Sequence, residues 1–294
     1  MNPNEILAIV VSFNGTNKLD ATVRALVGQV GHIHVVDNGS AEPTLAYLES
    51  LELLPEVSMT RLPENCGVGH ALNLGVAWAR DHGFTWLLTM DQDSLADKHM
   101  VEAYCLAVRE NPERVCLAPV LFVHGDLIKS AHDGIVEYAI TSGNLVRVDL
   151  FEIIGPYNEA MFIDAVDFDF CLRVRNSGQD IWRVAGAILH HELGEPHLVP
   201  WPIARFYTLH SPTRRYYMYR NFFYLAEQHV QKFPIFIIKS AIAHFILLLL
   251  IPFFDRQPWE SLAAVWQGIQ DYFSCRMGER KGRPAEPSPN KHPL

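Results

Sequence analysis

The N-terminal third of the sequence alternates strand-like and helix-like stretches, and this alternation restricts the possible folds more than any other feature. Continuous apolar, β-prone runs at 6–13, 33–36 and 86–90 predict strands buried on both faces. A shorter run at 57–62 predicts a further strand, and between the runs apolar residues recur at helical spacing. The pattern predicts an α/β fold with a mainly parallel sheet flanked by helices.

Polar residues follow the predicted strands at the point where each strand ends. Asn14 follows Phe13 at the end of the first run, Asp37 follows the second, and Asp91 and Asp93 follow the run at 86–90. Ligands of parallel α/β sheets gather at the carboxyl ends of the strands. We therefore predict that these residues lie together at one edge of the sheet and form a binding site there.

Asp91 and Asp93 are two residues apart, so on an extended backbone both carboxylates point to the same face. Two like charges that close repel each other unless a positive charge lies between them. A hard divalent cation held together with a nucleotide diphosphate would supply that charge, and Mg²⁺ or Mn²⁺ fits such oxygen ligands. The alternative is an ordinary acidic turn after a strand.

Three further acids stand in the stretch 161–173, at Asp164, Asp167 and Asp169. If Asp164 caps a helix that runs to about Arg175, Asp167 is its third residue, and the acids then stabilise the helix through caps and dipole. The functional alternative is that Asp167 points at the carboxyl edge of the sheet and accepts a proton from an attacking hydroxyl. Both interpretations remain open at this point.

Later segments supply residues of other chemical types. Gly143, in a stretch from Ser142 that begins another strand, allows close backbone approach to a ligand. His191 follows a strand-like run at 181–188 and would complete a cation's ligand set as a neutral imidazole, unless it is simply a histidine at a strand end. The segment 210–221 is dense in arginines, which suit phosphate oxygens, and in tyrosines, which stack on rings.

The charge is distributed unevenly along the chain. Residues 201–294 contain 12 Lys or Arg and 6 Asp or Glu, whereas the preceding residues contain 12 and 27. An acidic N-terminal part argues against nucleic acid as the main ligand, and a basic C-terminal part suits anionic lipid or phosphate. The sequence therefore predicts a membrane surface, and no nucleic acid, among the partners.

One apolar stretch, 233–254, contains a single charged residue, Lys239. Its uncharged part, 240–254, is shorter than the roughly 20 residues that span a bilayer, so we expect it to lie at a membrane interface, with a core helix as the alternative. We predict a membrane-association region at 226–278 and a disordered tail at 279–294. The five cysteines are odd in number and lack CxxC spacing, and no signal-peptide pattern is seen, so we expect a cytoplasmic protein at the inner face of the cell membrane.

Several motifs together resemble those of inverting GT-A glycosyltransferases of family 2. They occur in the family's order across residues 6–225, with Phe13 and Met90 as conservative departures from the commoner Tyr and Leu. The motifs are Val10-Val-Ser-Phe-Asn14, Val35-Val-Asp-Asn-Gly-Ser40, Asn65-Cys-Gly-Val-Gly69 with Asn73-Leu-Gly75, and Met90-Asp-Gln-Asp-Ser94. The Asp-Gln-Asp-Ser form, Phe162-Ile-Asp-Ala-Val-Asp-Phe168, His191-Glu-Leu-Gly194 and the segment 210–221 are similar to bacterial rhamnosyltransferases.

The resemblance implies a GT-A domain at 1–225, a nucleotide-sugar donor such as dTDP-L-rhamnose, and a polysaccharide or lipid-linked oligosaccharide acceptor, as in O-antigen synthesis. It implies that Asp167 is the base and that Asp91, Asp93 and His191 hold the metal. Acceptor contacts are expected from Asp164, His210 and Tyr216. Donor contacts are expected from Phe13, Asn14, Asp37, Asn65, Gly67, Asp91, Gln92, Ser142, Gly143, Arg214, Arg215 and Arg220.

Other functional classes fit the sequence less well. Gly67 and Gly69 lack the third glycine of a nicotinamide-binding loop, and no basic triphosphate-binding loop of a nucleotidyltransferase stands near the N-terminus. Transferases for another sugar, such as galactofuranose or a hexosamine, remain open, as does a non-catalytic nucleotide-sugar binding module. A binding module would have no use for a base at Asp167.

Overall fold

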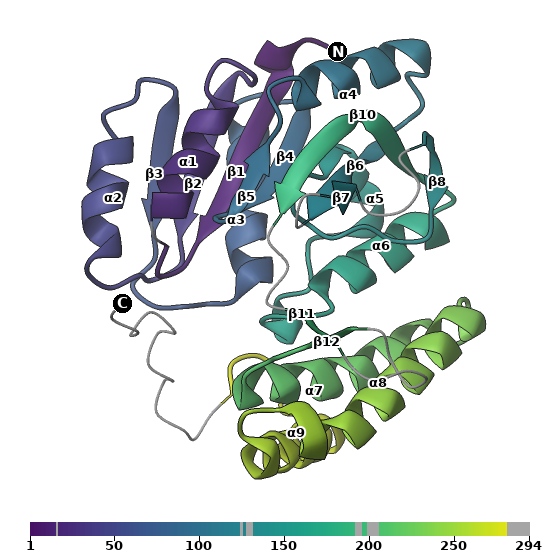
Figure 1. Cartoon of the computed structure of the whole chain (residues 1–294). Helices are drawn as coiled ribbons and strands as arrows, with labels where there is room; N and C mark the ends of the chain where they lie inside the picture. The colour runs from purple at the N-terminus through teal and green to yellow at the C-terminus, as the bar shows by residue number, and fades with distance from the viewer. Residues whose placement is uncertain (16, 124–125, 128–131, 192–195, 199–205, 281–294) are drawn as a thin grey trace.

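The computed structural model describes residues 1–15, 17–123, 126–127, 132–191, 196–198 and 206–280. Its main sheet has the strand order β3-β2-β1-β4-β9-β6-β10-β5, with β7 and β8 paired to β6 and β10. Below the carboxyl edge of this sheet lies a separate group of helices (Figure 1). The α/β class predicted from the sequence is confirmed.

The first half of the sheet is parallel and is built around a fully apolar central strand, as the apolar runs predict. Alternate residues of this strand face opposite layers, so that Ile6, Ala8 and Val10 pack on one side and Leu7 and Ile9 on the other. The elements are β1 (Ile6–Ser12), α1 (Asn17–Leu26), β2 (His32–Asp37), α2 (Thr44–Leu51), β3 (Val57–Arg61), α3 (Val68–Asp81) and β4 (Trp86–Asp91).

The second half of the sheet is mixed. β9 (Leu145–Arg147) runs antiparallel to both β4 and β6 (Cys116–Val123), and β10 (Ile181–His191) runs parallel to β6. The short strand β5 (Ser94–Ala96) closes the edge antiparallel to β10. The remaining elements are α4 (Met100–Glu110), β7 (Asp126–Leu127), β8 (Gly134–Val136), α5 (Leu150–Ile154), the 3₁₀ turn η2 (Glu159–Met161) and α6 (Val166–Asn176).

Two helices begin later than the sequence pattern predicts. Residues 95–109 have the pattern of a helix, but α4 begins at Met100, because Ala96 pairs with Leu189 of β10 and this long-range pairing keeps 94–96 extended. α6 was expected to start at an Asp164 cap, but residue 165 is its N-cap, in the left-handed conformation and without a side-chain cap. Asp167 is therefore the second residue of α6, and no capping bond from Asp164 explains its position.

The C-terminal group of helices comprises α7 (Pro212–His229), α8 (Pro234–Phe254) and α9 (Pro258–Phe273). We call it the helical lobe. α7 packs along α9, and Arg215 of α7 is joined to Asp255 by a fully buried ion pair, with 2.9 Å between Nη2 and Oδ1. The predicted division at residue 225 falls inside α7. The ribbon β11 (Pro196–Leu198) and β12 (Phe206–Thr208) lies between sheet and lobe, and the expected disordered tail falls outside the described residues except for 279 and 280.

Candidate active site

Two carboxylates and an imidazole meet at the carboxyl edge of the sheet. One ligand atom from each of Asp91, Asp93 and His191 lies within 4.8 Å of the others. Asp91 ends β4 and His191 ends β10, so strands far apart in the sequence bring them together. Ser94 lies 2.7 Å from Nδ1 of His191 and orients its ring, as the outer partners of metal-binding histidines do.

Asp91 is held in place by residues 142 and 143, which precede strand β9. Its backbone N–H donates to Oγ of buried Ser142 over 3.0 Å. Gly143 has a φ of 83°, and an added Cβ would crowd Pro119, so this position requires glycine. The Tyr104 hydroxyl donates to the carbonyl of Gly143 over 2.7 Å. Ser142 and Gly143, predicted as donor-binding, thus lie beside Asp91 and support it.

The electrostatics of this edge favour a bound cation. Burial, and then the charge of Asp93, raise the pKa of Asp91 to about 6, against a smaller lowering by Arg214. A carboxylate pair with an adjacent imidazole is a donor set that suits Mg²⁺ or Mn²⁺. The residues present therefore fit a divalent cation.

Asp167 lies next to this cluster at the start of α6. Burial raises its pKa to about 6, and the charges of Asp164 and Asp91 add to the shift, while the backbone N–H of Phe168 opposes it. That N–H donates to Oδ1 of Asp167 over 2.9 Å. A carboxyl with a pKa near neutrality, beside a predicted donor site, has the properties of a general base.

The turn before α6 has an unusual backbone. Phe162, Asp164 and Ala165 have φ values of 63°, 62° and 63°, which side-chain-bearing residues rarely adopt. The Asn221 side chain donates to three carbonyls of this segment, including that of Asp164 over 2.9 Å. Arg220 donates to the carbonyl of Met161 over 2.9 Å. We call residues 162–165 the acidic turn, and helix α7 holds it in shape.

The three arginines predicted to bind the donor lie in different environments. Arg214 is half exposed and donates to Asp164, with 3.2 Å between Nη2 and Oδ1. Arg215 and Arg220 are fully buried: Arg215 pairs with Asp255, and Arg220 binds backbone carbonyls. Their donor-binding assignment is corrected, because a buried guanidinium held by protein oxygens serves the fold. Only Arg214 of the three is placed to reach a ligand.

Two of the residues predicted to contact the acceptor, Tyr216 and His210, are buried or half-buried. Tyr216 is buried, and its hydroxyl donates to Asp271 of α9 over 2.8 Å, so it joins helices of the lobe and does not face the acceptor. His210 is half-buried just before α7. Burial, followed by the charges of Arg214 and Arg215, lowers its pKa to about 4, so its ring is neutral at pH 7.

The ends of β1 and β2 come together as predicted from their polar residues. Asn14 donates its N–H to Oγ of Ser40 over 2.8 Å, and the Ser40 hydroxyl in turn donates to buried Asp37. The Gln92 amide pairs with the main chain of Phe13, accepting over 2.8 Å and donating over 3.1 Å. Gln92 therefore fastens β1 to β4, a structural role in place of the predicted donor contact.

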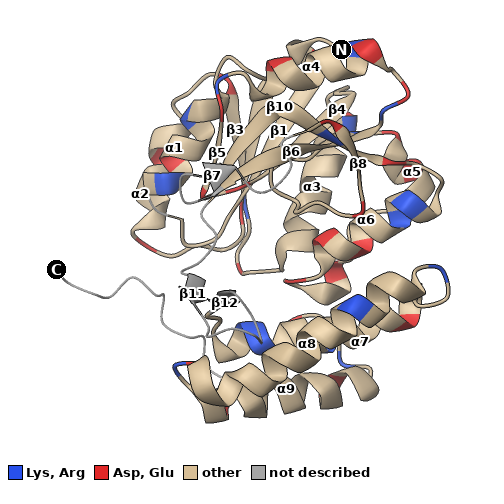
Figure 2. Ribbon diagram, turned by 45° about the vertical axis from the view of Figure 1, so that its right-hand side comes forward, with Lys and Arg blue, Asp and Glu red and all other residues tan. Residues whose placement is uncertain are grey.

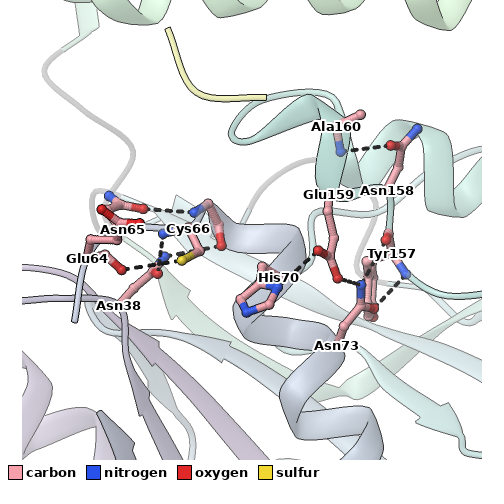
Figure 3. A network of polar contacts seen from close by, with 11 residues as sticks. Asn38, Glu64, Asn65, Cys66, His70, Asn73, Tyr157, Asn158, Glu159 and Ala160 are labelled. Atoms are coloured by element: carbon pink, nitrogen blue, oxygen red, sulfur yellow. Dashed lines mark hydrogen bonds and ion pairs between the residues drawn. The ribbon is translucent and has the colours of Figure 1, made fainter. Parts of the chain in front are cut away.

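Asn65 and Gly67 form hydrogen bonds in the loop after β3, and the next residue, Val68, donates its N–H to the carbonyl of Phe162 in the acidic turn over 2.8 Å. Figure 3 shows the contacts of Asn38, Asn65 and Cys66. Asn65 accepts from the N–H of Gly67 over 2.9 Å, and Asn38 accepts from Cys66 and donates to Gly67. Gly67 has a φ of 88°, and a Cβ there would crowd the backbone of Phe162. The loop after β3 thus packs directly on the acidic turn.

Further polar contacts lie along α3. Asn73 donates to Glu159 over 2.7 Å, and His70 lies 3.0 Å from the same carboxylate (Figure 3). Glu159, Asn38 and Asn221 are not among the site residues predicted from the sequence. The sequence pattern gives little indication of their roles, because each is a single polar residue whose partners are distant in sequence.

A cavity of about 590 Å³ lies behind α6, between α6, α7 and residues 154–159. Asp169 faces it from a buried cluster, where it accepts from Arg173 over 2.8 Å and lies 2.9 Å from Nε2 of His229. Asp91, Asp93 and Asp167 do not line this cavity. Asp169 therefore joins α6 to α7 and is separate from the acidic edge.

Comparison with known proteins agrees with this geometry. Residues 7–151 match the family described as Glycosyl transferase family 2. The dTDP-rhamnosyl transferase RfbF of Shigella flexneri is 28% identical over 253 residues, which cover 78% of this chain and 82% of that protein.

Solved structures share the fold at low sequence identity. S. aureus TarS 1-349 in complex with UDP-GlcNAc has a TM-score of 0.58 at 16% identity, covering 90% of this chain and 80% of that one. GalNAc-T7 with UDP, GalNAc and Mn²⁺ has a TM-score of 0.57 at 13% identity over 76% of this chain. The present chain spans 47% of that GalNAc-T7 chain and 44% of a longer S. aureus TarS chain.

Proposed function

Since the chain belongs to glycosyltransferase family 2 and has the GT-A fold, we propose that it transfers L-rhamnose from dTDP-L-rhamnose, with inversion, to a hydroxyl of a glycan. The acceptor in this proposal is a polysaccharide or a lipid-linked oligosaccharide. The catalytic domain is assigned to residues 1–225 together with the parts of the helical lobe that hold the acidic turn.

The observation that carries the proposal is that the Asp91–Asp93 pair and Asp167 lie close together at the carboxyl edge of the sheet, in different surroundings. Asp91 and Asp93 lie with His191, where a cation and a diphosphate can bind. Asp167 lies close enough for the charge of Asp91 to raise its pKa. A donor site beside a carboxyl of near-neutral pKa is what an inverting transfer requires.

In the proposed reaction, Asp167 accepts the proton of the acceptor hydroxyl. The hydroxyl oxygen then forms a bond to the anomeric carbon, and the bond between that carbon and the diphosphate oxygen breaks on the opposite face. Asp164 holds Arg214 toward the same edge, where the guanidinium stabilises the negative charge of the departing diphosphate.

Asp91, Asp93 and His191 would hold the divalent cation. When bound, Mg²⁺ or Mn²⁺ neutralises charge on the diphosphate leaving group. Asn14 and Asp37, at the ends of β1 and β2, are placed to bind the nucleoside part of the donor.

The choice of sugar rests on the similarity to the Shigella flexneri dTDP-rhamnosyl transferase over most of both chains. The alternative donor is a UDP-hexosamine, because a chain of the same fold, TarS, binds UDP-GlcNAc. Galactofuranose donors are a further alternative, which neither of these two similarities supports. A non-catalytic binding module is the alternative from another class.

A donor screen tests the proposal directly. Release of nucleoside diphosphate is measured for the purified chain with dTDP-L-rhamnose, UDP-GlcNAc and UDP-galactofuranose, each with Mn²⁺ and with chelator, in the presence of a lipid-linked glycan pool. We expect release from dTDP-L-rhamnose only with metal. Turnover of UDP-GlcNAc alone would show that the transferred sugar is a hexosamine and not rhamnose. Binding of a donor without any turnover would support a binding module.

A further inference from the structure

α8 exposes a continuous apolar stripe. Six of its large apolar side chains recur every three or four residues along one face and are 52–78% exposed: Ile235, Ile238, Ile242, Phe245, Leu249 and Phe253. We call these residues the apolar stripe. A soluble protein rarely leaves so long a row of large apolar side chains in water, so the stripe indicates a partner.

Two of the three polar residues of α8, Ser240 and His244, lie on the side that faces the protein. His244 is half-buried, donates toward the carbonyl of Ser240 over 2.8 Å and stacks on Phe222 of α7, with 4.6 Å between ring centroids. Ser240 is half-buried as well. The inward side is otherwise apolar, with Ile237, Leu250 and Ile251 buried, so α8 is apolar on its outer side and on most of its inner side. A helix that borders water is instead polar on its outer side. Hydrocarbon is the surrounding that matches this arrangement.

Within the described residues, α8 is the one helix long and apolar enough to cross a bilayer, with 21 residues and a mean hydropathy of 2.3. Its neighbours argue against crossing. α7 precedes it and α9 follows it, and these two helices pack closely along each other. An α8 that crossed a bilayer would therefore draw these two helices and their charged residues into it, whereas a helix that lies along the surface does not.

The surroundings of the stripe suit an anionic lipid surface. Lys232, Lys239 and Arg256 are exposed beside or within α8. Of the three acids in residues 230–276, all described, Asp255 and Asp271 are buried in ion pairs. Figure 2 shows correspondingly few red segments on α8 and α9.

Tryptophans extend the exposed face to the next helix. Trp259 and Trp266 of α9 are 78% and 62% exposed and lie one heptad apart, on one side of that helix. Tryptophan is enriched at the boundary between headgroups and acyl chains. Phe253 and Trp259, on either side of the short connection between the helices, are both exposed.

We propose that the apolar stripe of α8 is a docking surface for an anionic bilayer, on which the helix lies flat, at the inner face of the cell membrane. The stripe supplies the apolar contact, and the adjacent lysines and arginine bind lipid phosphates. This inference is independent of the sugar transferred, because it concerns a surface that the acidic edge does not use.

Vesicle binding without donor or metal tests the proposal. The full chain is floated with vesicles of phosphatidylcholine alone or mixed with phosphatidylglycerol, and compared with Ile238→Ser/Ile242→Ser/Phe245→Ser/Leu249→Ser. A matched control, Leu53→Ser/Leu106→Ser, changes exposed apolar residues after α2 and on α4, away from the helical lobe (Figure 1). We expect binding to the mixed vesicles, an affinity at least about a hundredfold lower for the stripe variant, and an unchanged control.

Two further measurements separate the remaining outcomes. Brominated lipids should quench Trp259 and Trp266 at headgroup depth, judged against Trp259→Phe and Trp266→Phe; quenching at the bilayer centre would overturn the flat orientation. If the wild type does not bind vesicles but forms a dimer that the stripe variant dissolves, a second copy covers the stripe and the proposal fails. If the fourfold variant does not fold, Ile242→Ser and Phe245→Ser singly give the same comparison.

Discussion

Arg214 at the start of α7 and Asp164 in the acidic turn are joined by an ion pair, with 3.2 Å between Nη2 and Oδ1, across fifty positions of sequence. The pair connects the helical lobe to the edge where Asp91 lies: burial raises the pKa of Asp164 and of Asp91, and the charge of Arg214 opposes that rise in both. It places one half-exposed cation beside the acidic cluster. Arg214 is therefore the arginine of α7 on which activity should depend.

The first prediction compares Arg214→Gln with Arg220→Gln. Arg214 is half exposed, so its loss should cost less than about 1 kcal/mol of stability while lowering kcat/KM for the donor at least about tenfold. Arg220 is buried on backbone carbonyls, and its loss should cost at least about 3 kcal/mol. Chemical denaturation and donor kinetics measure both. Equal effects of the two variants on stability would contradict the assignment.

The second prediction concerns the cation. Asp93→Asn should abolish saturable Mn²⁺ binding in calorimetry and reduce turnover at least about a hundredfold, because it removes one of two carboxylate ligands. The control is Asp97→Asn, a nearby acid that lies 3.8 Å from His190 outside the cluster, and it should bind Mn²⁺ normally. Near-normal turnover of the wild type in chelator would refute metal dependence.

The third prediction separates Asp167 from Asp169. Asp167→Asn should lower kcat at least about a hundredfold with donor affinity unchanged, because the proton acceptor is lost and the base faces the acceptor. Asp169→Asn should instead cost about 3 kcal/mol of stability, since it breaks a buried cluster with Arg173 and His229, and should reduce kcat less. Asp164→Asn should also reduce kcat less than Asp167→Asn. If the Asp167→Asn variant transfers sugar normally, the proposed general-base mechanism is wrong.

The fourth prediction concerns the pH dependence of stability without metal. The pKa of Asp91 is raised from 3.8 to about 6 in the folded protein, so the folded state holds this proton more tightly than the unfolded chain does. Its contribution is full below the unfolded pKa and is lost as pH rises through about 6. Asp91→Asn should therefore raise the melting temperature at pH 7.5 and raise it less at pH 5.

Added Mn²⁺ should change the sign of that difference, because a ligand of the folded state stabilises only the protein that binds it. Differential scanning fluorimetry of both proteins, at both pH values and with and without Mn²⁺, gives all the comparisons. A melting-temperature difference that is the same at pH 5 and pH 7.5 would show that Asp91 is not the titrating group.

Local pattern predicted the first half of the fold well, because the runs that form β1, β2 and β4 are buried on both faces. The predicted strand at 57–62 is found at Val57–Arg61, and the helical spacing before it corresponds to α2 at Thr44–Leu51. The antiparallel strands β5 and β9 are three residues each and depend on partners far along the chain. The strand expected from Ser142 is found as β9, but no local pattern contains its antiparallel partners or the extended conformation of 94–96.

The same distinction applies to the site. Asp91 and Asp93 could be placed together because they are two residues apart at a strand end, although residues 92 and 93 form a turn and not the extended backbone that the prediction assumed. The arginines of α7 could not be sorted from sequence, because Arg214, Arg215 and Arg220 differ only in which side of the helix meets α9 and the acidic turn. Burial, which depends on the whole fold, decides which of them can reach a ligand.

The backbone of the acidic turn has a consequence for how such proteins can exchange parts. Left-handed residues other than glycine cost about 1–3 kcal/mol each and persist only where their surroundings hold them. Here the holders are Asn221 and Arg220 of α7, and Arg220 also donates to the carbonyl of Gly278, after α9. A hybrid protein joined between the sheet and the helical lobe would therefore separate the acidic turn from the α7 residues that hold its conformation. Viable hybrids between relatives should inherit residues 157–280 as one block, even though the family match ends at residue 151.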